Sequence, residues 1–563
     1  MTRFVFVVCC LLVSGCAFID DFSRFEVDPN RADAGDAGTP PDARVIDAPG
    51  CVARPETCNG EDDDCDGTTD EEPTECSSPN GLVGCVAGSC EMTECVGGFE
   101  DCTDEPGCET DPTSDAEHCG GCGMGCLTGQ LCTASTCAYP RITAHYILEG
   151  TGNSALRHVA TDATSAIVVA GTSGGDGTLA ETPVAAPGDI VARIEPSGTV
   201  DWIAPSPIFA NDIAVIPTGV VYVAGSYSGT LAFGAGTTSS RGGTVDAAIL
   251  SYEPNGAPRN VHAAGSSTGS DSLNGIDVRD GRWAFVGSAD GALQGETHAG
   301  GRDAFAGASL SDLGPFPEQY GGTESDVLYG VALASDGGYT VIGRYGGSAD
   351  FGGTMPAPDY MERFSTTSLI IASYTLEATQ TWQLTLPRYY AESGNRAQVA
   401  VDRDGNVYWT AGLTGGTADR PDLGTGPLPG LFVIASYTAD GVLRWAVSTS
   451  ANVSDSSISL SSDESLLYLA GDYFGTSEVI PGGDPFPDGG ETDCAVLALE
   501  TETGELRWGT TITSADSVRC EGVAAQGPGV WVAGSFRGTV NFGGELATAA
   551  VGTNDGFVAF LEP

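Results

Sequence analysis

From residue 139 onward, the hydrophobic pattern repeats a short apolar segment that is rich in β-branched and aromatic residues and ends in glycine. The segments are residues 167–171, 221–225, 284–287, 340–343, 408–412, 468–471 and 531–534. Their terminal glycines lie 54 to 69 residues apart, which indicates one supersecondary unit repeated seven times. No segment has a convincing helical period, so a helical solenoid and a parallel α/β sheet are excluded.

The fifth repeat shows the whole unit, because four apolar strands are separated there by turn residues. The expected strands are residues 397–401, 407–413, 432–437 and 443–447. Asp-Gly turns and a Gly- and Pro-rich loop connect them, as in antiparallel hairpins. Four-stranded units repeated radially form a β-propeller. The sequence therefore predicts an all-β fold with a seven-bladed propeller over residues 139–563, preceded by a small disulfide-rich irregular module and a disordered tether.

The two ends of the repeat region predict how the ring closes. The last repeat reaches its third strand at residues 555–561, and no fourth strand follows it. An additional strand at residues 143–148 precedes the first repeat, whose first strand is expected at residues 156–160. If the strand at residues 143–148 pairs with the strand at residues 555–561, neither is left as an open sheet edge. We therefore expect this N-terminal strand to complete the seventh blade.

The N-terminal 15 residues form a predicted export signal. Arg3 precedes an apolar run at residues 4–13, which is too short for a permanent membrane span but typical of a signal peptide. No other segment has the roughly 18 continuous apolar residues of a membrane helix. Residues 16–50 are rich in Pro, Gly and Asp, which predicts a flexible acidic tether.

The signal ends in Val13-Ser14-Gly15-Cys16, which resembles the lipobox of bacterial lipoproteins. The resemblance implies that Cys16 receives a diacylglyceryl group with acyl chains such as palmitate and becomes the first residue. Ala17 follows it in place of the Asp that signals inner-membrane retention, which favours the outer membrane, with either periplasmic or cell-surface orientation. An ordinary signal peptide with an incidental Cys is the alternative.

The 19 cysteines are clustered. Cys9 and Cys10 leave with the signal and Cys16 is lipidated, so an even number remains, which export to an oxidising compartment would allow to pair. The candidates are Cys51, Cys58, Cys65, Cys76, Cys85, Cys90, Cys95, Cys102, Cys108, Cys119, Cys122, Cys126, Cys132, Cys137, Cys494 and Cys520. Residues 51–138 have few large apolar side chains, so disulfides must hold this module together, with connectivity that the sequence does not give. Cys494 and Cys520 are expected to join two blades.

An acidic loop in this module is a candidate metal site. Its possible ligands are Asp62, Asp64, Asp66, Asp70 and Glu71, at mostly alternate positions around the turn at Gly67. Carboxylates in this pattern can converge on one hard cation, although a solvated acidic turn is the alternative. The loop resembles the calcium loops of EF-hand-like and thrombospondin type 3 repeats, but it lacks the Glu at the twelfth position of an EF-hand. With its flanking cysteines it resembles still more the Cys-rich metal-binding motif of myxobacterial-type surface lipoproteins. That motif has been connected with copper, but oxygen ligands favour Ca²⁺.

A second cysteine pattern lies at residues 107–137. Cys119-x-x-Cys122 has zinc or redox spacing, but an oxidising compartment and the many neighbouring cysteines favour disulfides. The segment resembles the Gly-Cys-Glu modules of the same surface lipoproteins. The repeats resemble bacterial cell-surface β-propeller repeats through Gly-x-Phe-x-Gly-x-x-x-Phe-Gly, which stands at residues 534–543.

The net charge of −53 excludes nucleic acid and anionic lipid surfaces as direct partners, and it leaves cations or a basic protein surface open. All 23 basic residues are Arg. The charge is densest at residues 51–138, which carry 20 acidic side chains and one basic one. The membrane is therefore expected to be reached through the N-terminal lipid only.

The propeller offers weak evidence of catalysis. Gly171-x-Ser173-x-Gly175 and Gly265-x-Ser267-x-Gly269 have nucleophile-elbow spacing without a following helix. The stretch ending at Trp508 resembles a quinoprotein repeat, in which such Trp residues dock blades. We therefore expect no catalytic residue and no organic cofactor, and a non-enzymatic lipoprotein that presents its propeller to a protein or glycan. A propeller enzyme, either a glycan hydrolase or a quinoprotein, and an envelope assembly scaffold remain the alternatives.

Overall fold

The structure is a computed structural model of the whole chain. It describes residues 53–71, 76–103, 107–126, 130–184, 187–240, 245–293, 296–309, 318–352, 367–386, 390–391, 397–414, 422–424, 426–430, 432–449, 452–474, 491–542 and 547–563. The predicted signal, Cys16, the tether and Cys51 lie outside these residues. The described residues contain no helix, and so none long and apolar enough to cross a membrane.

The chain divides into two compact units, Met1–Glu94 and Cys95–Pro563. The first contains the acidic loop and most of the hairpin of β1 (Gly81–Val86) and β2 (Ser89–Cys95). The second begins with an irregular segment that includes the hairpin of β3 (Leu131–Thr133) and β4 (Thr136–Ala138). The domain boundary expected between residues 138 and 139 stays a prediction.

Disulfides replace a hydrophobic core in the cysteine-rich region. The pairs in the first unit are Cys58–Cys85 and Cys76–Cys90. Those at the start of the second unit are Cys95–Cys108, Cys102–Cys122, Cys119–Cys132 and Cys126–Cys137. Cys65 is also disulfide-bonded. The Cys119-x-x-Cys122 pair therefore consists of two half-cystines with different partners, which leaves no thiolate for zinc at this motif.

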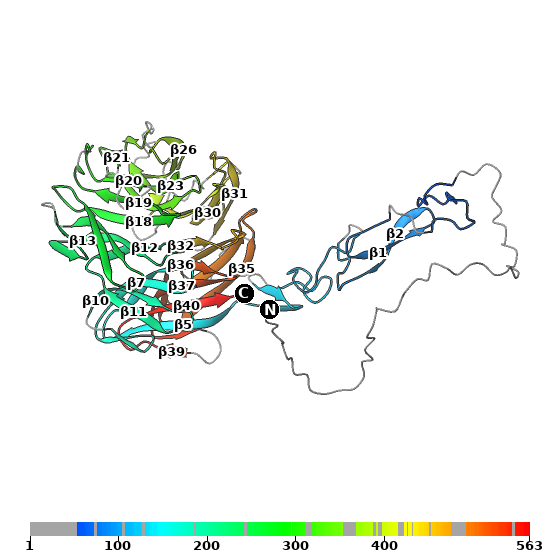
Figure 1. Ribbon diagram of the computed structural model, residues 1–563, viewed down its shortest axis with the longest axis horizontal. Coiled ribbons are helices and arrows are strands. Elements are labelled where there is room, and N and C mark those ends of the chain that lie inside the picture. The colour runs from blue at the N-terminus through cyan, green and yellow to red at the C-terminus, as the bar shows by residue number, and fades with distance from the viewer. Residues whose placement is uncertain are drawn as a thin grey trace, which may run out of the picture. The chain divides into compact units, whose positions relative to one another are not determined.

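Seven antiparallel sheets, each with four main strands, form the propeller (Figure 1). Blade 1 contains β6 (Ala155–Thr161), β7 (Ile167–Ser173), β10 (Gly188–Ile194) and β11 (Val200–Pro205). Blade 2 contains β12 (Phe209–Val215), β13 (Val221–Tyr227), β16 (Asp246–Tyr252) and β17 (Pro258–Ala264). Blade 3 contains β18 (Ser272–Arg279), β19 (Arg282–Ala289), β20 (Asp303–Ser309) and β21 (Glu318–Gly322). Blade 4 contains β22 (Val327–Leu333), β23 (Tyr339–Gly346), β25 (Thr367–Tyr374) and β26 (Gln380–Leu386).

The remaining blades follow the same order. Blade 5 contains β28 (Gln398–Val401), β29 (Val407–Thr414), β30 (Phe432–Tyr437) and β31 (Leu443–Thr449), with β27 (Tyr390–Ala391) also paired to β29. Blade 6 contains β32 (Asn452–Leu460), β33 (Leu466–Phe474), β34 (Asp493–Glu500) and β35 (Leu506–Ser514). Blade 7 contains β36 (Ser517–Gln526), β37 (Gly529–Arg537), β40 (Asp555–Glu562) and β5 (Arg141–Gly150). We name the four strands of each blade A to D from the centre outward.

The ring closes as the sequence predicts. Strand β5 lies next to β40 as strand D of the last blade (Figure 1). The innermost strands contact one another in the order β6, β12, β18, β22, β28, β32 and β36, and β36 contacts β6 again. The fold class predicted from the repeats, a seven-bladed propeller after a disulfide-rich module, is confirmed.

Short hairpins between strands B and C link neighbouring blades. Strand β8 (Gly177–Leu179) pairs with β9 (Thr182–Val184) and with β5 of the preceding blade. Strand β38 (Thr539–Asn541) pairs with β39 (Ala547–Ala549) and with β35 of the preceding blade. Likewise, β24 (Ala349–Asp350) pairs with β21. In blade 2, β14 (Thr230–Phe233) and β15 (Gly236–Ser239) form a separate hairpin. Strands β8, β24 and β38 thus cover strand D of the preceding blade, which would otherwise be an exposed sheet edge.

The Gly-x-Phe-x-Gly-x-x-x-Phe-Gly motif builds these hairpins. In blade 7, Phe536 and Phe542 are buried and meet edge to face, with ring centroids 6.2 Å apart. In blade 4, Tyr345 and Phe351 occupy the same positions, with ring centroids 6.3 Å apart. The two aromatic positions therefore hold the hairpin against its blade, and the motif is structural.

The tryptophans of strand D dock one blade onto the next. Trp445 of β31 donates a hydrogen bond from Nε1 to the carbonyl oxygen of Thr501 in blade 6, at 2.8 Å. A Cβ on Gly504, which has φ of +75°, would lie 2.5 Å from the Trp445 ring. The C–D turn therefore needs glycine both for its backbone and for the indole that packs against it.

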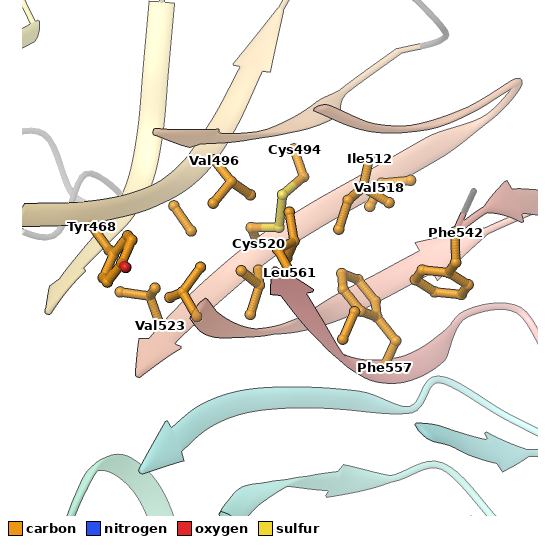
Figure 2. Packing of buried hydrophobic residues seen from close by; sticks show 14 of the residues in the cluster. Tyr468, Cys494, Val496, Ile512, Val518, Cys520, Val523, Phe542, Phe557 and Leu561 are labelled. Carbon is orange, nitrogen blue, oxygen red and sulfur yellow. A yellow bond between two sulfur atoms is a disulfide. The ribbon is translucent and has the colours of Figure 1, made fainter. Parts of the chain in front are cut away.

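Blades 6 and 7 are also joined covalently. Cys494 of β34 and Cys520 of β36 form a disulfide in the middle of a buried cluster that includes Val496, Val518 and Phe557 (Figure 2). The bond therefore crosslinks neighbouring blades beside the point where β5 closes the ring.

The repeated glycine lies two or three residues before the end of strand B and is explained by a close backbone approach. In blades 1, 2, 3, 4 and 7, strand A has a register shift beside this glycine. A Cβ at Gly225 would lie 1.9 Å from the carbonyl oxygen of Phe209 in strand A, and one at Gly534 would lie 1.9 Å from that of Arg519. Only glycine lets strand A bulge inward at this point.

We therefore expect Gly225→Ala to destabilise the propeller by at least about 3 kcal/mol, because a main-chain carbonyl and not a mobile side chain blocks the methyl group. The matched control is Gly229→Ala, where a Cβ would meet nothing within 4 Å and only φ of +73° opposes it. That variant should lose about 1 kcal/mol. Urea unfolding of the two variants checks the difference, and equal midpoints would contradict the explanation.

Candidate functional site

The acidic loop at residues 53–71 folds around Glu56. Glu56 is 8% exposed, and its two carboxylate oxygens accept hydrogen bonds from the backbone N–H groups of Asp64, at 2.7 Å, and Asp70, at 3.0 Å. Carboxylate oxygens of Glu56, Asp64 and Glu71 all lie within 4.8 Å of one another. The structure thus brings together two of the predicted ligands, Asp64 and Glu71, with one that the sequence analysis did not include.

The other predicted ligands take part in the turns of the loop. Asp62 accepts hydrogen bonds from the N–H groups of Asp66, at 3.1 Å, and Gly67, at 2.9 Å. Asp66 accepts one from the N–H of Thr68, at 2.8 Å. Asp70 Oδ1 accepts one from the N–H of Asn59, at 2.8 Å. These bonds fix the loop and leave further lone pairs on the oxygens.

Glu71 is the side chain whose surroundings most favour a cation. Both of its carboxylate oxygens are buried, and no other described residue donates a well-formed hydrogen bond to them. Its own backbone N–H lowers its pKa, but burial and the negative charges of Asp66, Glu56 and Asp64 outweigh this and raise the pKa. A hard cation at this point would supply the missing partner and relieve the repulsion.

In the propeller, a buried aspartate recurs at or next to the start of strand C. These residues are Asp189, Asp246, Asp303, Asp493 and Asp555, of which the last four are almost fully buried. Asp555 accepts hydrogen bonds from the N–H groups of Val551, at 2.8 Å, and Gly150, at 3.3 Å. The aspartate at this position therefore holds loops in place through hydrogen bonds, on the face where the D–A and B–C connections lie.

One of these aspartates lies close to a second buried carboxylate. A Cβ on Gly321 would lie 2.7 Å from both Asp303 Oδ1 and Asp326 Oδ2. Asp326 accepts hydrogen bonds from the N–H groups of Gly322 and Gly346, each at 2.8 Å. Burial raises the pKa of Asp326 to about 7, against the lowering effect of those N–H groups and with a contribution from the charges of Asp303 and Glu324.

This pKa predicts a pH dependence of stability. The pKa of Asp326 is higher in the folded than in the unfolded chain, so protonation of Asp326 stabilises the fold. This contribution to the free energy of unfolding is complete below pH ~4 and is lost as the pH rises to about 7. Asp326→Asn should remove this decline, which reaches at most ~1.4 kcal/mol per pH unit. Denaturant unfolding from pH 4 to 8 measures the slope, with Asp336→Asn, at an exposed turn, as the control. A wild-type slope in Asp326→Asn would contradict the prediction.

The central channel has a volume of about 350 Å³ and is lined by the innermost strands. Its charged groups hold these strands together: Asp212 accepts from the N–H of Ile276, at 2.9 Å, and Asp277 accepts from the N–H of Leu333, at 2.7 Å. Arg279 donates to the carbonyl oxygen of Val401 across the ring, at 2.8 Å. We therefore assign the channel residues a structural role.

A larger polar cavity, of about 450 Å³, lies where blades 6, 7 and 1 meet. Strand β36 contributes Ser517, Arg519 and Glu521, and the starts of β6 and β34 and the end of β37 complete it. Its lining residues are Asn153, Ser154, Ala155, Arg157, Glu491, Thr492, Ser517, Arg519, Glu521, Ser535, Phe536, Arg537 and Asn554. The cavity therefore belongs to the same face as the D–A and B–C connections.

The cavity contains three arginines but only two acidic residues. Arg537 pairs with Glu491, at 2.6 Å between Nη2 and Oε2. Arg157 pairs with Glu521, at 3.5 Å between Nε and Oε2. The Arg519 side chain is exposed and has no hydrogen bond or ion pair within the described part of the chain. One guanidinium thus remains available for an anionic ligand.

Two of the residues considered for catalysis, Ser173 and Trp508, have structural surroundings. Ser173 is 1% exposed and donates a hydrogen bond to the carbonyl oxygen of Gly175, at 2.9 Å. Trp508 is 1% exposed and packs in the cluster that contains Cys520 and other residues of blade 7. Trp508 therefore takes the docking position that the sequence analysis favoured over cofactor binding.

Sequence reasoning did not identify the three arginines of the cavity, because more than 350 residues separate Arg157 from Arg519 and only ring closure brings them together. The strand C aspartates could have been found, since each directly precedes the apolar run of its strand, as in Asp246-Ala-Ala-Ile-Leu.

No protein-family model matches the chain, and no curated protein sequence matches it. Among solved structures, the chain is similar to hydrazine synthase from Kuenenia stuttgartiensis, with a TM-score of 0.38 and 9% identity over 68% of this chain and 93% of that one. It is similar to the Dos1 propeller, with a TM-score of 0.36 and 8% identity over 75% and 95% of the two chains. It is also similar to a gluconolactonase from Xanthomonas campestris, with a TM-score of 0.31 and 13% identity over 61% and 94%. These similarities assign neither a reaction nor a ligand to this chain.

Proposed function

We propose that the chain is an exported, lipid-anchored protein of the outer membrane that presents its propeller as a non-enzymatic binding module for a protein or glycan. The observation that carries the proposal is the polar cavity at the junction of blades 6, 7 and 1. Its volume lies within the range of small-ligand sites, roughly 300–1,000 Å³. Both of its glutamates are paired with arginines, which suits recognition better than proton transfer.

The cellular location rests on two further features. The disulfides of the described residues fit a protein that folds in an oxidising compartment. Cys16 follows a short apolar run at the position of a lipidated cysteine. In this proposal the lipid holds the chain at the membrane, and the acidic tether keeps the folded parts away from it.

The cysteine-rich region is proposed to bind Ca²⁺ through Glu56, Asp64 and Glu71, with the other carboxylates of the loop nearby. Support comes from the buried, unpartnered oxygens of Glu71. The ligands are all oxygen atoms, which suits a hard cation, and the cysteines beside them are disulfide-bonded and so unable to hold copper as thiolates.

The binding proposal is tested by incubating the full chain with panels of glycans and peptides and measuring both capture and product formation. We expect a ligand that is bound and recovered unchanged. Release of a product at a rate that depends on the protein would overturn the non-enzymatic proposal. Capture that persists when the propeller is replaced by an unrelated domain would also overturn it.

The location is tested by adding protease to intact cells that produce the wild-type chain or Cys16→Ala. We expect the wild-type propeller to fractionate with the outer membrane and Cys16→Ala to be soluble. Cleavage of the wild-type chain from outside would place the propeller on the cell surface, and equal fractionation of both chains would contradict the lipid anchor.

A further inference from the structure

We propose that the cavity between blades 6, 7 and 1 binds the carboxylate of an acidic sugar, such as a uronic acid within a glycan, with Arg519 as the residue that holds the carboxylate. This inference rests on the proposed function, because it names the class of ligand that the binding module takes. Three observations support it: the positive charge of the cavity, the ion pairs that engage two of its three arginines, and the polar side chains of the cavity wall.

The charge of the cavity is opposite to that of the chain. The protein has 76 acidic and 23 basic residues, yet three arginines meet two glutamates in this one cavity. The overall negative field repels extended polyanions. A single carboxylate can still be held at short range, because a guanidinium offers it two parallel charge-assisted hydrogen bonds.

The three arginines differ in how strongly they are engaged. Arg157 donates to Thr172 Oγ1 at 2.7 Å, pairs with Glu521 and lies over the ring of Phe209, 5.4 Å from its centre. Arg537 pairs with Glu491 at 2.6 Å. Arg519 has no side-chain hydrogen bond and no ion pair within the described residues. Its guanidinium can therefore bind a ligand without first breaking an ion pair. The two paired arginines are therefore positioned to support the site, and Arg519 to contact the ligand.

The cavity wall favours a saccharide over a peptide. Apart from the charged groups, the wall includes six hydroxyl and amide side chains, of which Asn153, Ser517 and Asn554 are at least partly exposed and Ser154, Thr492 and Ser535 are buried. The one aromatic residue, Phe536, is 1% exposed and offers no stacking surface to a side chain. Peptides are bound at free strand edges, in apolar grooves or, when acidic, by clusters of arginines, whereas two of the three arginines of this cavity are already paired with glutamates. A sugar ring instead presents many hydroxyls, to which the amides of Asn153 and Asn554 and the hydroxyl of Ser517 offer donors and acceptors.

Calorimetry with the full chain tests the inference, using digalacturonic acid and its neutral counterpart, a galactose disaccharide. We expect at least ten-fold tighter binding of the acidic sugar, with an affinity that falls as NaCl is raised. Arg519→Ala should weaken its binding at least ten-fold, and Arg519→Lys should retain part of it. The control is Arg403→Ala, which removes the same charge from a side chain that is 71% exposed in blade 5, and it should bind like wild type.

Equal affinity for the two sugars, no binding of the acidic sugar, or unchanged binding by Arg519→Ala would overturn the inference. Tighter binding of a tetraglutamate peptide than of digalacturonic acid would overturn it in favour of an acidic peptide. The proposed function would survive these results if another ligand were captured by the propeller. Conversion of the acidic sugar to products would instead refute the proposed function, even if Arg519 were needed for binding.

Discussion

Replacing β5 with a glycine–serine segment of the same ten residues is expected to abolish cooperative unfolding of the propeller. Strand β5 pairs with β40 and with β8, and its Leu148 is fully buried. Its loss would expose the edge of β40 and the apolar residues beneath it, and the whole ring depends on that closure. Since domains are stable by only ~5–15 kcal/mol, we expect a chain that is largely unfolded or aggregated at 37 °C.

The matched control replaces the ten residues from Thr230 to Ser239, which form the separate hairpin of β14 and β15. This hairpin buries Leu231 and Phe233 but lies outside the four-stranded blade, so a smaller loss of stability is expected. Thermal unfolding followed by circular dichroism, with size-exclusion chromatography, compares the two chains. Equal, cooperative transitions in both would contradict a closing role for β5.

Calcium is expected to stabilise the acidic loop of the full chain by about 2.7 kcal/mol when the free ion is present at ~100 times its dissociation constant. Calorimetry should detect a site of millimolar or better affinity, in the range of extracellular modules, and chelation should make residues 53–71 more sensitive to protease. Glu71→Gln should weaken this site at least ten-fold, because it removes the charge whose buried oxygens lack a partner.

The control for calcium is Glu91→Gln, which removes an exposed charge from β2 in the same unit. It should leave the affinity within about two-fold, since exposed charges are screened by solvent. Identical titrations of wild type and Glu71→Gln would contradict the assignment of the site. Absence of any calcium binding would remove the metal from the proposal altogether.

The sequence predicts the propeller well because its repeat obeys strong local rules. Strand B contains an apolar run that ends in a glycine such as Gly225, which the bulge of strand A requires. The expected strands of the fifth repeat agree with β28–β31 to within two residues. The closure by β5 follows from counting strands and needs no knowledge of distant contacts.

The metal-binding loop and the cavity are harder to predict, because each depends on which side chains the fold brings close together. Asp64 and Glu71 were expected to share a cation, but Glu56 precedes the recognised pattern and joins them only through the fold of the loop. The cavity depends on Arg157 and Arg519, which belong to opposite ends of the repeat region. Pairing also decides which arginine is available, and no property of the linear sequence distinguishes Arg519 in this respect.

Hydrogen exchange of the full chain with and without saturating digalacturonic acid shows where the propeller holds its ligand. We expect slower exchange at residues 153–157, 517–521 and 535–537, which line the cavity. Slower exchange confined to the channel residues 212–215 and 276–279, or no change anywhere, would contradict this expectation.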